Sequence, residues 1–272
     1  MANGPKIKSL LLIFREILAM KNLVRAMSIS MILSLLFTCK RQNEVRIFVS
    51  WPGGEGLPHY TWKRGETKPT GIEPAFLERL LTIAELPYSY VANFDFSGEG
   101  DPRIEALTSG KADLCIRALS INEERKKSIL FTNPYYFDGL SALVRTSDSL
   151  FTLSDLNGKK VYTLAFTSAH NWAKKNLNLS TLLTYEKFDT AFVKPEGLLL
   201  HHEIDAYVLD KSFLTEIAKN QPQLRVMERK FTEESIGIGV SKNRPDLVNK
   251  LNEAMEIMKE TGEFDLYLNQ LK

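Results

Sequence analysis

The chain has 272 residues, of which 44% are hydrophobic and 25% are charged, the composition of an ordinary globular protein. Its 35 basic and 33 acidic residues leave a net charge of +2, which gives no reason to expect nucleic acid or an anionic membrane surface as a partner. The only two cysteines, Cys39 and Cys115, lie in very different contexts, so a disulfide framework is not expected.

A short apolar segment near the amino terminus predicts export. Residues 28–38 are mostly apolar, Lys21 and Arg25 precede them, and Cys39 follows. A basic flank before a short apolar run is the layout of a secretory signal peptide, and a membrane-spanning helix would need about 20 apolar residues. We therefore assign residues 1–39 to an export segment and leave them out of the fold.

Cys39 resembles the cleavage site of bacterial lipoproteins, in which the cysteine becomes the lipidated first residue of the mature chain. This resemblance implies a lipid anchor that holds the protein in the periplasm or at the cell surface. An uncleaved anchor, or a signal peptide in which Cys39 has no role, stays open. A further hypothesis places the start of translation at Met20 rather than Met1, because Met20 opens the more typical signal sequence.

After Cys39 the sequence alternates between short β-branched runs and segments of helical periodicity. Strands are predicted at residues 45–49, 88–91, 113–116, 158–165, 204–209 and 236–240. Helices are predicted at 72–83, 102–109, 245–261 and 263–271, another ends near His202, and others begin near Ser120, Ser168 and Asp210. Cys115 lies in an apolar run and is expected to be buried. This alternation indicates an α/β fold with mainly parallel strands.

Three helix starts carry polar residues of interest. Ser120 to Glu123 reads as a capping box, which predicts a helix with Arg125 in its first turns, where free backbone N–H groups favour an anion. Ser168 is expected to cap the next of these helices, and Asp210 the third.

The segment from Ser109 to Tyr136 resembles the polar amino-acid-binding proteins of ABC importers. The family pattern is a Gly-x-x-Asp strand, then Ser-Ile/Met-Thr-x-x-Arg, then a Phe-Thr-x-Pro-Tyr turn. This chain keeps every anchor of the pattern except the threonine, which is Asn122. The likeness extends over about residues 44–272.

The resemblance implies a periplasmic-binding-protein-like fold of type II, with two α/β lobes joined by a hinge around an interlobe cleft. Lobe 1 is expected to comprise residues 44–141 and 236–272, and lobe 2 residues 142–235. The two crossover strands are expected near 140–144 and 235–240.

A free amino acid carries a carboxylate and an ammonium, so its site needs a cation and an anion on opposite lips of the cleft. The resemblance implies that Arg125 and Ser120 bind the carboxylate, with two parallel N–H bonds from the guanidinium, and that Asp210 binds the ammonium. A surface ion pair of Arg125 with Glu123 or Asp138, and a purely capping role for Asp210, are the alternatives.

Thr167 and Ser168 lie at a strand-to-helix turn and are expected to offer hydroxyl and N–H groups to the same carboxylate; helix capping alone is the alternative. The family usually has glycine where this chain has Phe166. Tyr60 is expected to stack on the ligand. Trp51 is an alternative stacking group, and both aromatic residues could instead belong to the core.

Arg117 departs most from the family pattern, which generally has a small residue that faces the ligand there. The change predicts an acidic ligand, such as glutamate, aspartate or another dicarboxylate, or else a local salt bridge to Glu105 or Asp138. Ala118, the next residue, is also assigned to the ligand-binding site.

We therefore expect a monomeric extracytoplasmic protein that binds an amino acid or related carboxylate by closure of two lobes and delivers it to an ABC permease. No cofactor, metal site or nucleic-acid partner is expected, because no metal-ligand spacing, nucleophile motif or phosphate loop occurs. Binding rather than catalysis is expected. An enzyme resembling periplasmic cyclohexadienyl dehydratases, with His59 as the histidine near the cleft, and a ligand-sensing protein stay open.

Overall fold

The computed structural model describes most of the chain that follows the expected export segment. The described residues are 44–50, 52, 54–56, 58–92, 96–97, 100–185 and 194–271. Val45–Lys272 forms one compact unit. Cys39 with the rest of the export segment, and also Trp51, lie outside the described residues. Within the described part, no helix is both long and apolar enough to cross a membrane.

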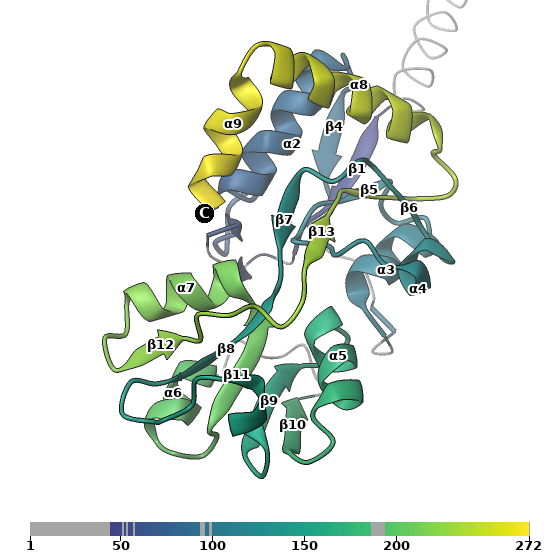
Figure 1. Ribbon diagram of the computed structural model, residues 1–272. Helices are drawn as coiled ribbons and strands as arrows, with labels where there is room; N and C mark the ends of the chain where they lie inside the picture. The colour runs from purple at the N-terminus through teal and green to yellow at the C-terminus, as the bar shows by residue number, and fades with distance from the viewer. Residues whose placement is uncertain are drawn as a thin grey trace, which may run out of the picture. The chain divides into compact units, whose positions relative to one another are not determined.

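A five-stranded sheet forms the centre of lobe 1 (Figure 1). Its strand order is β4 (Tyr88–Tyr90), β1 (Val45–Phe48), β5 (Leu114–Cys115), β14 (Gly239–Val240) and β6 (Leu130–Phe131). Strand β1 runs parallel to β4 and β5, whereas β14 runs antiparallel to β5 and β6. A late segment of the chain therefore fills the gap between two strands from the first half.

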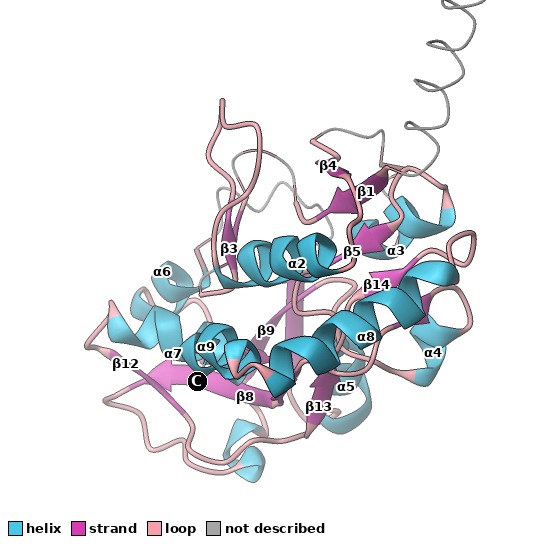
Figure 2. Cartoon of the chain, turned by 90° about the horizontal axis from the view of Figure 1, so that it is seen from above, coloured by secondary structure: helices cyan, strands magenta, loops and turns pink. Residues whose placement is uncertain are grey.

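Helices cover both faces of this sheet because its strands alternate their side chains between two cores. Ile47 and Leu114 face the larger core, which they share with helices α2 (Ile72–Ile83), α8 (Asp246–Glu260) and α9 (Glu263–Leu268). Helices α2 and α8 pack against each other on this face (Figure 2). Phe48 and Cys115 face the smaller core, with α3 (Pro102–Thr108). The expected burial of Cys115 is confirmed.

A second five-stranded sheet forms the centre of lobe 2. Its order is β10 (Thr181–Tyr185), β9 (Lys160–Leu164), β11 (Ala206–Asp210), β8 (Leu140–Arg145) and β12 (Leu224–Val226). Strand β9 runs parallel to β10 and β11, and β8 runs antiparallel to β11 and β12. Helices α5 (Ser168–Asn176), α6 (Pro195–Leu200) and α7 (Lys211–Lys219) share one apolar core with it.

Two antiparallel strands, β7 (Tyr136–Asp138) and β13 (Glu234–Ile236), form a separate ladder that connects to both sheets. Residues 140–144, expected in the crossover, instead lie in β8 of the second sheet, and the strand expected at 236–240 is divided between β13 and β14. The crossover is tight at Gly139, where an added Cβ would lie 2.0 Å from the carbonyl oxygen of Thr232. The exact lobe boundaries stay a prediction.

The remaining short elements are β2 (Glu55–Gly56), β3 (Tyr60–Thr61), α4 (Glu123–Lys126), and the 3-10 helices η1 (Leu153–Leu156) and η3 (Asn269–Leu271). The β2–β3 hairpin leads to α2 through Gly71, whose φ of 121° is a conformation that favours glycine. A Cβ at this position would lie 2.6 Å from the carbonyl oxygen of His59. Gly71 thus lets the hairpin approach the start of α2 and places His59 beside Glu73.

Candidate ligand-binding site

The predicted site residues gather at the carboxyl ends of parallel strands in both sheets. Arg117 and Ala118 follow β5, which runs parallel to its neighbour β1. In the second sheet, Thr167 follows β9, and Asp210 ends the parallel neighbour β11. Ligands of open α/β sheets bind outside the carboxyl ends of strands. Both lobes therefore carry their predicted residues at the edge where a ligand is expected.

Arg125 is buried and belongs to a cluster of Arg103, Asp101 and Arg125 that we call the arginine anchor. Arg125 Nη1 donates to the Ser120 carbonyl oxygen at 2.9 Å, and Nη2 donates to Asp101 Oδ2 at 3.2 Å. Arg103 donates to both oxygens of the same carboxylate, at 2.8 and 2.7 Å. Two guanidinium groups share one carboxylate, so the anchor carries a net charge of +1.

This arrangement contradicts the alternative of a surface ion pair for Arg125. The side chain of Arg125 is 9% exposed and pairs with Asp101. Glu123, one of the expected partners, pairs with Lys126 instead. Asp138, the other, accepts hydrogen bonds from the backbone N–H groups of Gly139 and Ser212.

The charge on Arg125 is incompletely compensated by the protein itself. Burial disfavours the guanidinium ion and the like charge of Arg103 repels it, and together these lower the pKa of Arg125 below its ordinary value despite nearby Asp101 and Asp210. Burial opposes ionisation of Asp101 as well, but the two arginines hold its pKa below the ordinary value. A carboxylate from a ligand would supply the missing negative charge and accept charge-assisted hydrogen bonds.

Ser120 and Ser168 connect the two lobes through their hydroxyl groups, whose oxygens lie 3.2 Å apart. Ser120 does not begin a helix, because it forms an antiparallel bridge with Ile236. Asn122 caps α4 instead, and its side chain accepts the N–H of Arg125. The predicted capping box is therefore wrong, and that N–H group is not free for a ligand.

Thr167, and not Ser168, caps α5. The hydroxyl of Thr167 accepts from the N–H of His170 at 3.2 Å and donates to a backbone carbonyl within the same turn. The hydroxyl of Ser168 is thereby left for the contact with Ser120. Phe166 adopts a φ of 61°, so the turn takes the left-handed conformation where the family pattern has glycine.

Asp210 is buried at the end of β11, with 8% of its surface exposed. It occupies the N-cap position of α7, but its side chain makes no capping hydrogen bond, so the predicted cap is wrong. Burial, reinforced by the negative charges of Glu234 and Asp138, raises the pKa of Asp210 to about 7. Its Oδ1 atom has no hydrogen-bond donor among the described residues. A buried acceptor without a donor is a group that an ammonium ion can satisfy.

Tyr60 and Arg117 contact each other on lobe 1. Tyr60 is buried in the larger core, and its hydroxyl lies 3.5 Å from Ser50 Oγ. The guanidinium of Arg117 lies over the tyrosine ring, 5.3 Å from its centroid. The next residue, Ala118, has a φ of 42°, and its N–H donates to Glu73 Oε1 at 2.8 Å.

His59 and Glu73 form a buried ion pair that also contacts lobe 2. His59 Nδ1 lies 3.3 Å from Glu73 Oε1, and Nε2 lies 3.0 Å from the hydroxyl of Ser212 on α7. The imidazole stacks on Phe213 at 4.3 Å, and the hydroxyl of Tyr135 donates to Glu73. Burial opposes a charge on His59, but the Glu73 carboxylate raises the pKa of His59 above its ordinary value.

A cavity of about 470 Å³ lies between the lobes. Asp101 and Arg125 line it from lobe 1, and Ser168 and His170 line it from lobe 2. His59 contacts Ser212 of lobe 2, but the expectation that it is the only histidine near the cleft is wrong: His170 lines the cavity and bonds to Thr163 Oγ1 at 2.8 Å. The predicted site residues that do not line this cavity are Tyr60, Arg117, Ala118, Ser120, Thr167 and Asp210.

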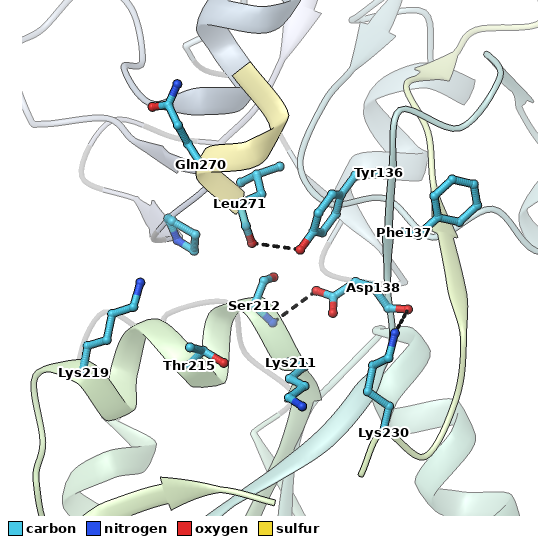
Figure 3. Close-up of a pocket in the computed structure, with 11 residues that line it drawn as sticks. Tyr136, Phe137, Asp138, Lys211, Ser212, Thr215, Lys219, Lys230, Gln270 and Leu271 are labelled. Carbon is cyan, nitrogen blue, oxygen red and sulfur yellow. Dashed lines mark hydrogen bonds between the residues drawn. The ribbon is translucent and has the colours of Figure 1, made fainter. Parts of the chain in front are cut away.

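A smaller hollow of about 220 Å³ lies beside the crossover strand β7 and the start of α7 (Figure 3). Asp138 accepts from the N–H of Ser212 at 3.2 Å there, and the hydroxyl of Tyr136 donates to the carbonyl oxygen of Leu271 at 2.8 Å. None of the predicted ligand-binding residues lines this hollow. Its polar groups connect the crossover to lobe 2 and to the last residues of lobe 1.

Sequence reasoning missed Asp101 and Arg103. The dipeptide Asp101-Pro102 is a recognisable helix start, and Asp101 is the N-cap of α3 in the structure. This signal identifies a cap, but nothing local in the sequence reveals that the same carboxylate reaches Arg125. The described residues contain no cluster of acidic, histidine or cysteine side chains able to hold a metal ion.

Comparison with known proteins agrees with the fold. The family model "Bacterial extracellular solute-binding proteins, family 3" matches residues 54–270. The L-cystine-binding protein TcyJ of Escherichia coli (strain K12) is 28% identical over 214 residues, which cover 77% of each chain. An ancestral arginine-binding protein bound to arginine is 27% identical, with a TM-score of 0.69 over 83% of this chain and 96% of the other. The substrate-binding protein AbpA of Streptococcus pneumoniae, bound to L-arginine, has a TM-score of 0.71 over 85% and 95% at 22% identity.

Proposed function

Because the chain belongs to the bacterial extracellular solute-binding proteins of family 3, we propose that it binds one amino acid between its two lobes. The observation that carries this proposal is the arginine anchor, whose net positive charge faces a cavity shared by both lobes. The α-carboxylate of the ligand bonds to Arg125. When the lobes separate to let the ligand enter, this carboxylate also bonds to the hydroxyl groups of Ser120 and Ser168. The α-ammonium bonds to the buried carboxylate of Asp210.

The neighbouring residues have supporting roles in this proposal. Thr167 fixes the turn that presents Ser168, since its hydroxyl is already used within α5. Ala118 is small and leaves room beside the ligand. Tyr60, expected to stack on the ligand, is buried in the larger core and supports the Arg117 guanidinium over its ring. The names of the relatives support an amino acid as the solute, because they bind cystine or arginine.

Ligand-dependent stabilisation tests this proposal. Thermal unfolding of the purified protein would be followed with each of the twenty amino acids, L-cystine, small dicarboxylates and sugars. A ligand present at 100 times its dissociation constant adds about 2.7 kcal/mol to the free energy of unfolding, or roughly 5–10 °C for a chain of this size.

The variant Arg125→Ala removes the proposed carboxylate contact, and Lys126→Ala, at an exposed neighbour, is the matched control. We expect Arg125→Ala to lose the shift and Lys126→Ala to keep it. A full shift with a sugar, or with an amino acid in Arg125→Ala, would contradict the proposed site.

We also propose delivery of the solute to an ABC permease, without chemical conversion, by a monomer anchored through a lipid on Cys39. Metabolic labelling with an alkyne fatty acid tests the anchor. The label and the membrane association are both expected to disappear in Cys39→Ser and to persist in Cys115→Ser, because Cys115 is buried in lobe 1. Label that persists in Cys39→Ser would overturn the lipoprotein assignment.

A further inference from the structure

Arg117 is a cation that no described acidic side chain neutralises, since it forms no ion pair within that part of the chain. Glu105 and Asp138, the two partners that the sequence analysis expected for Arg117, form hydrogen bonds with other groups. Glu105 accepts from the N–H and hydroxyl of Ser97, at 2.9 and 2.6 Å. Asp138 accepts from two backbone N–H groups of the crossover and α7. The salt bridges expected between Arg117 and Glu105 or Asp138 are therefore not formed.

The position of Arg117 connects it to the arginine anchor. Its carbonyl oxygen accepts from Arg103 Nη1 at 3.2 Å, and Arg103 in turn holds the carboxylate that Arg125 shares. Arg117 follows β5 at the same sheet edge as Ser50, which follows the parallel strand β1, and the hydroxyl of Tyr60 lies 3.5 Å from Ser50 Oγ. The partly exposed guanidinium lies over the tyrosine ring, which fixes its place without neutralising its charge.

The charges on this wall of lobe 1 do not balance. Among the described residues, Arg103, Arg117 and Arg125 carry three positive charges and only Asp101 carries a carboxylate paired with them, which leaves a net charge of +2. Glu73 does not change the sum, because it is paired with His59. The α-carboxylate of an amino acid would remove one of the two charges and leave the other on Arg117.

We propose that Arg117 binds a second carboxylate at the far end of the ligand, and that the solute is an amino acid with two carboxylates. This inference rests on the proposed function, in which Arg125 binds the first carboxylate and Asp210 the ammonium. A guanidinium grips a carboxylate with two parallel N–H bonds, which a neutral amide cannot match in charge. Glutamate and aspartate have this chemistry, and so does L-cystine, which carries a second ammonium as well.

The test compares ligand pairs that differ only in charge. Isothermal titration of the purified protein with glutamate and glutamine, and with aspartate and asparagine, gives two affinity ratios. We expect the acidic member of the better pair to bind at least about 30-fold more tightly, the lower end of the effect of a buried charge pair. Titration with L-cystine distinguishes a dicarboxylic amino acid such as glutamate from cystine as the ligand, because only cystine brings a second ammonium together with its second carboxylate.

The variants Arg117→Gln and Arg117→Lys test the residue, and Arg64→Gln, at an exposed arginine outside the site, is the matched control. In Arg117→Gln, the affinities for the acidic amino acid and for its amide should differ by less than about threefold. Arg117→Lys should keep part of the preference for the acid, and Arg64→Gln should not change that preference. Circular dichroism checks that each variant folds.

The wild-type ratios test the inference even where a variant fails to fold. Tighter binding of glutamine or arginine than of any dicarboxylic amino acid would overturn it, and so would an acid preference that persists in Arg117→Gln. In both cases an amino acid still binds, so the proposed function stands. Failure of every amino acid to bind the wild type would instead refute the proposed function.

Discussion

The hydroxyl oxygens of Ser120 and Ser168 lie 3.2 Å apart, and this contact joins a bridge residue of lobe 1 to the first residue of α5 in lobe 2. The contact lies beside the arginine anchor, because the carbonyl oxygen of Ser120 accepts from Arg125. The ligand carboxylate that we propose to bond to Arg125, Ser120 and Ser168 would therefore enter between these two hydroxyl groups.

A disulfide in place of this contact should lock the lobes. In the double variant Ser120→Cys and Ser168→Cys, the two sulfur atoms would occupy positions close enough for a bond after a small adjustment. Oxidation without ligand should abolish amino-acid binding, and reduction should restore it, as followed by titration with the ligand found for the wild type. The two single variants are the controls. Unchanged binding by the oxidised protein would show that the lobes do not need to separate.

The shared carboxylate of the arginine anchor should matter for stability as well as for binding. Asp101→Asn leaves Arg103 and Arg125 facing each other without a counter-charge, and breaking a buried ion pair costs about 3–5 kcal/mol. Chemical unfolding in urea measures the loss. Glu123→Gln, at a side chain that is 87% exposed, should change the free energy of unfolding by less than about 0.5 kcal/mol. A similar, small effect of both substitutions would contradict the anchor.

Ligand binding should depend on pH through Asp210. The pKa of its carboxyl is raised to about 7 in the ligand-free protein, so below that pH the ammonium of the ligand must displace a proton. The dissociation constant should therefore rise up to about tenfold per pH unit below pH 7 and stay level above it. Calorimetry at pH 6 in two buffers of different ionisation enthalpy measures the released proton.

Asp210→Asn should bind weakly and lose this pH dependence. Without ligand, the raised pKa predicts the opposite trend for folding, because the contribution of Asp210 to stability is present below its ordinary pKa near 4 and is lost as the pH rises through about 7. If the dissociation constant of Asp210→Asn rises below pH 7 as steeply as that of the wild type, the titrating group is another one, such as His59.

The ion pair of His59 and Glu73 should stabilise the protein most strongly at mildly acidic pH. The pKa of His59 is raised, so its contribution is complete below its ordinary pKa of about 6.5 and is lost as the pH rises through the folded value. The pKa of Glu73, which burial would raise, is lowered by His59, Tyr135 and the Ala118 N–H, so its contribution is lost only in more acidic solution.

Urea unfolding of Glu73→Gln tests this pair. We expect a loss of about 3–5 kcal/mol near pH 6 and a smaller loss near pH 9, because the imidazolium has then lost its proton. Glu256→Gln, at an exposed ion pair with Lys259, is the control and should change little at either pH. An equal loss at both pH values would mean that Glu73 acts through hydrogen bonds alone.

The sequence predicted the α/β fold class, the helices and the strands β1, β4, β5, β9 and β11, because hydrophobic periods of 3.6 and 2 are local properties. It missed β6, β7, β10 and β12, and the expected mainly parallel pairing is wrong, because both five-stranded sheets mix parallel and antiparallel strands. It was less reliable at helix starts. Ser120, Ser168 and Asp210 all looked like caps, but Asn122 and Thr167 hold two of those roles and Asp210 makes no capping bond. Where several polar residues lie close together at a helix start, any of them can cap the helix. The residues that make tertiary contacts, as Ser120 and Ser168 do here, leave the cap to a neighbour.

The candidate site was predictable only where a motif carried it. Arg125 lies in such a motif, and the structure places it beside the interlobe cavity as a buried cation. Its partner Asp101 lies 24 residues away and Glu73 lies 45 residues from the N–H of Ala118, so no local pattern links them. Whether Arg117 binds a ligand or pairs with Glu105 or Asp138 likewise could not be decided from the sequence, because it depends on which groups these two carboxylates contact in the fold.

The place of β14 between β5 and β6 fixes the order in which the lobes can mature. Lobe 2 draws its sheet from one continuous stretch, β8 to β12, so its pairing partners are all present before residue 227. Lobe 1 lacks its inner strand until Gly239 and Val240 arrive, and until then β5 and β6 share no ladder. In a chain that emerges from its amino terminus, the lobe begun first is thus finished last, and a late truncation would leave an assembled lobe 2 attached to an open half-sheet.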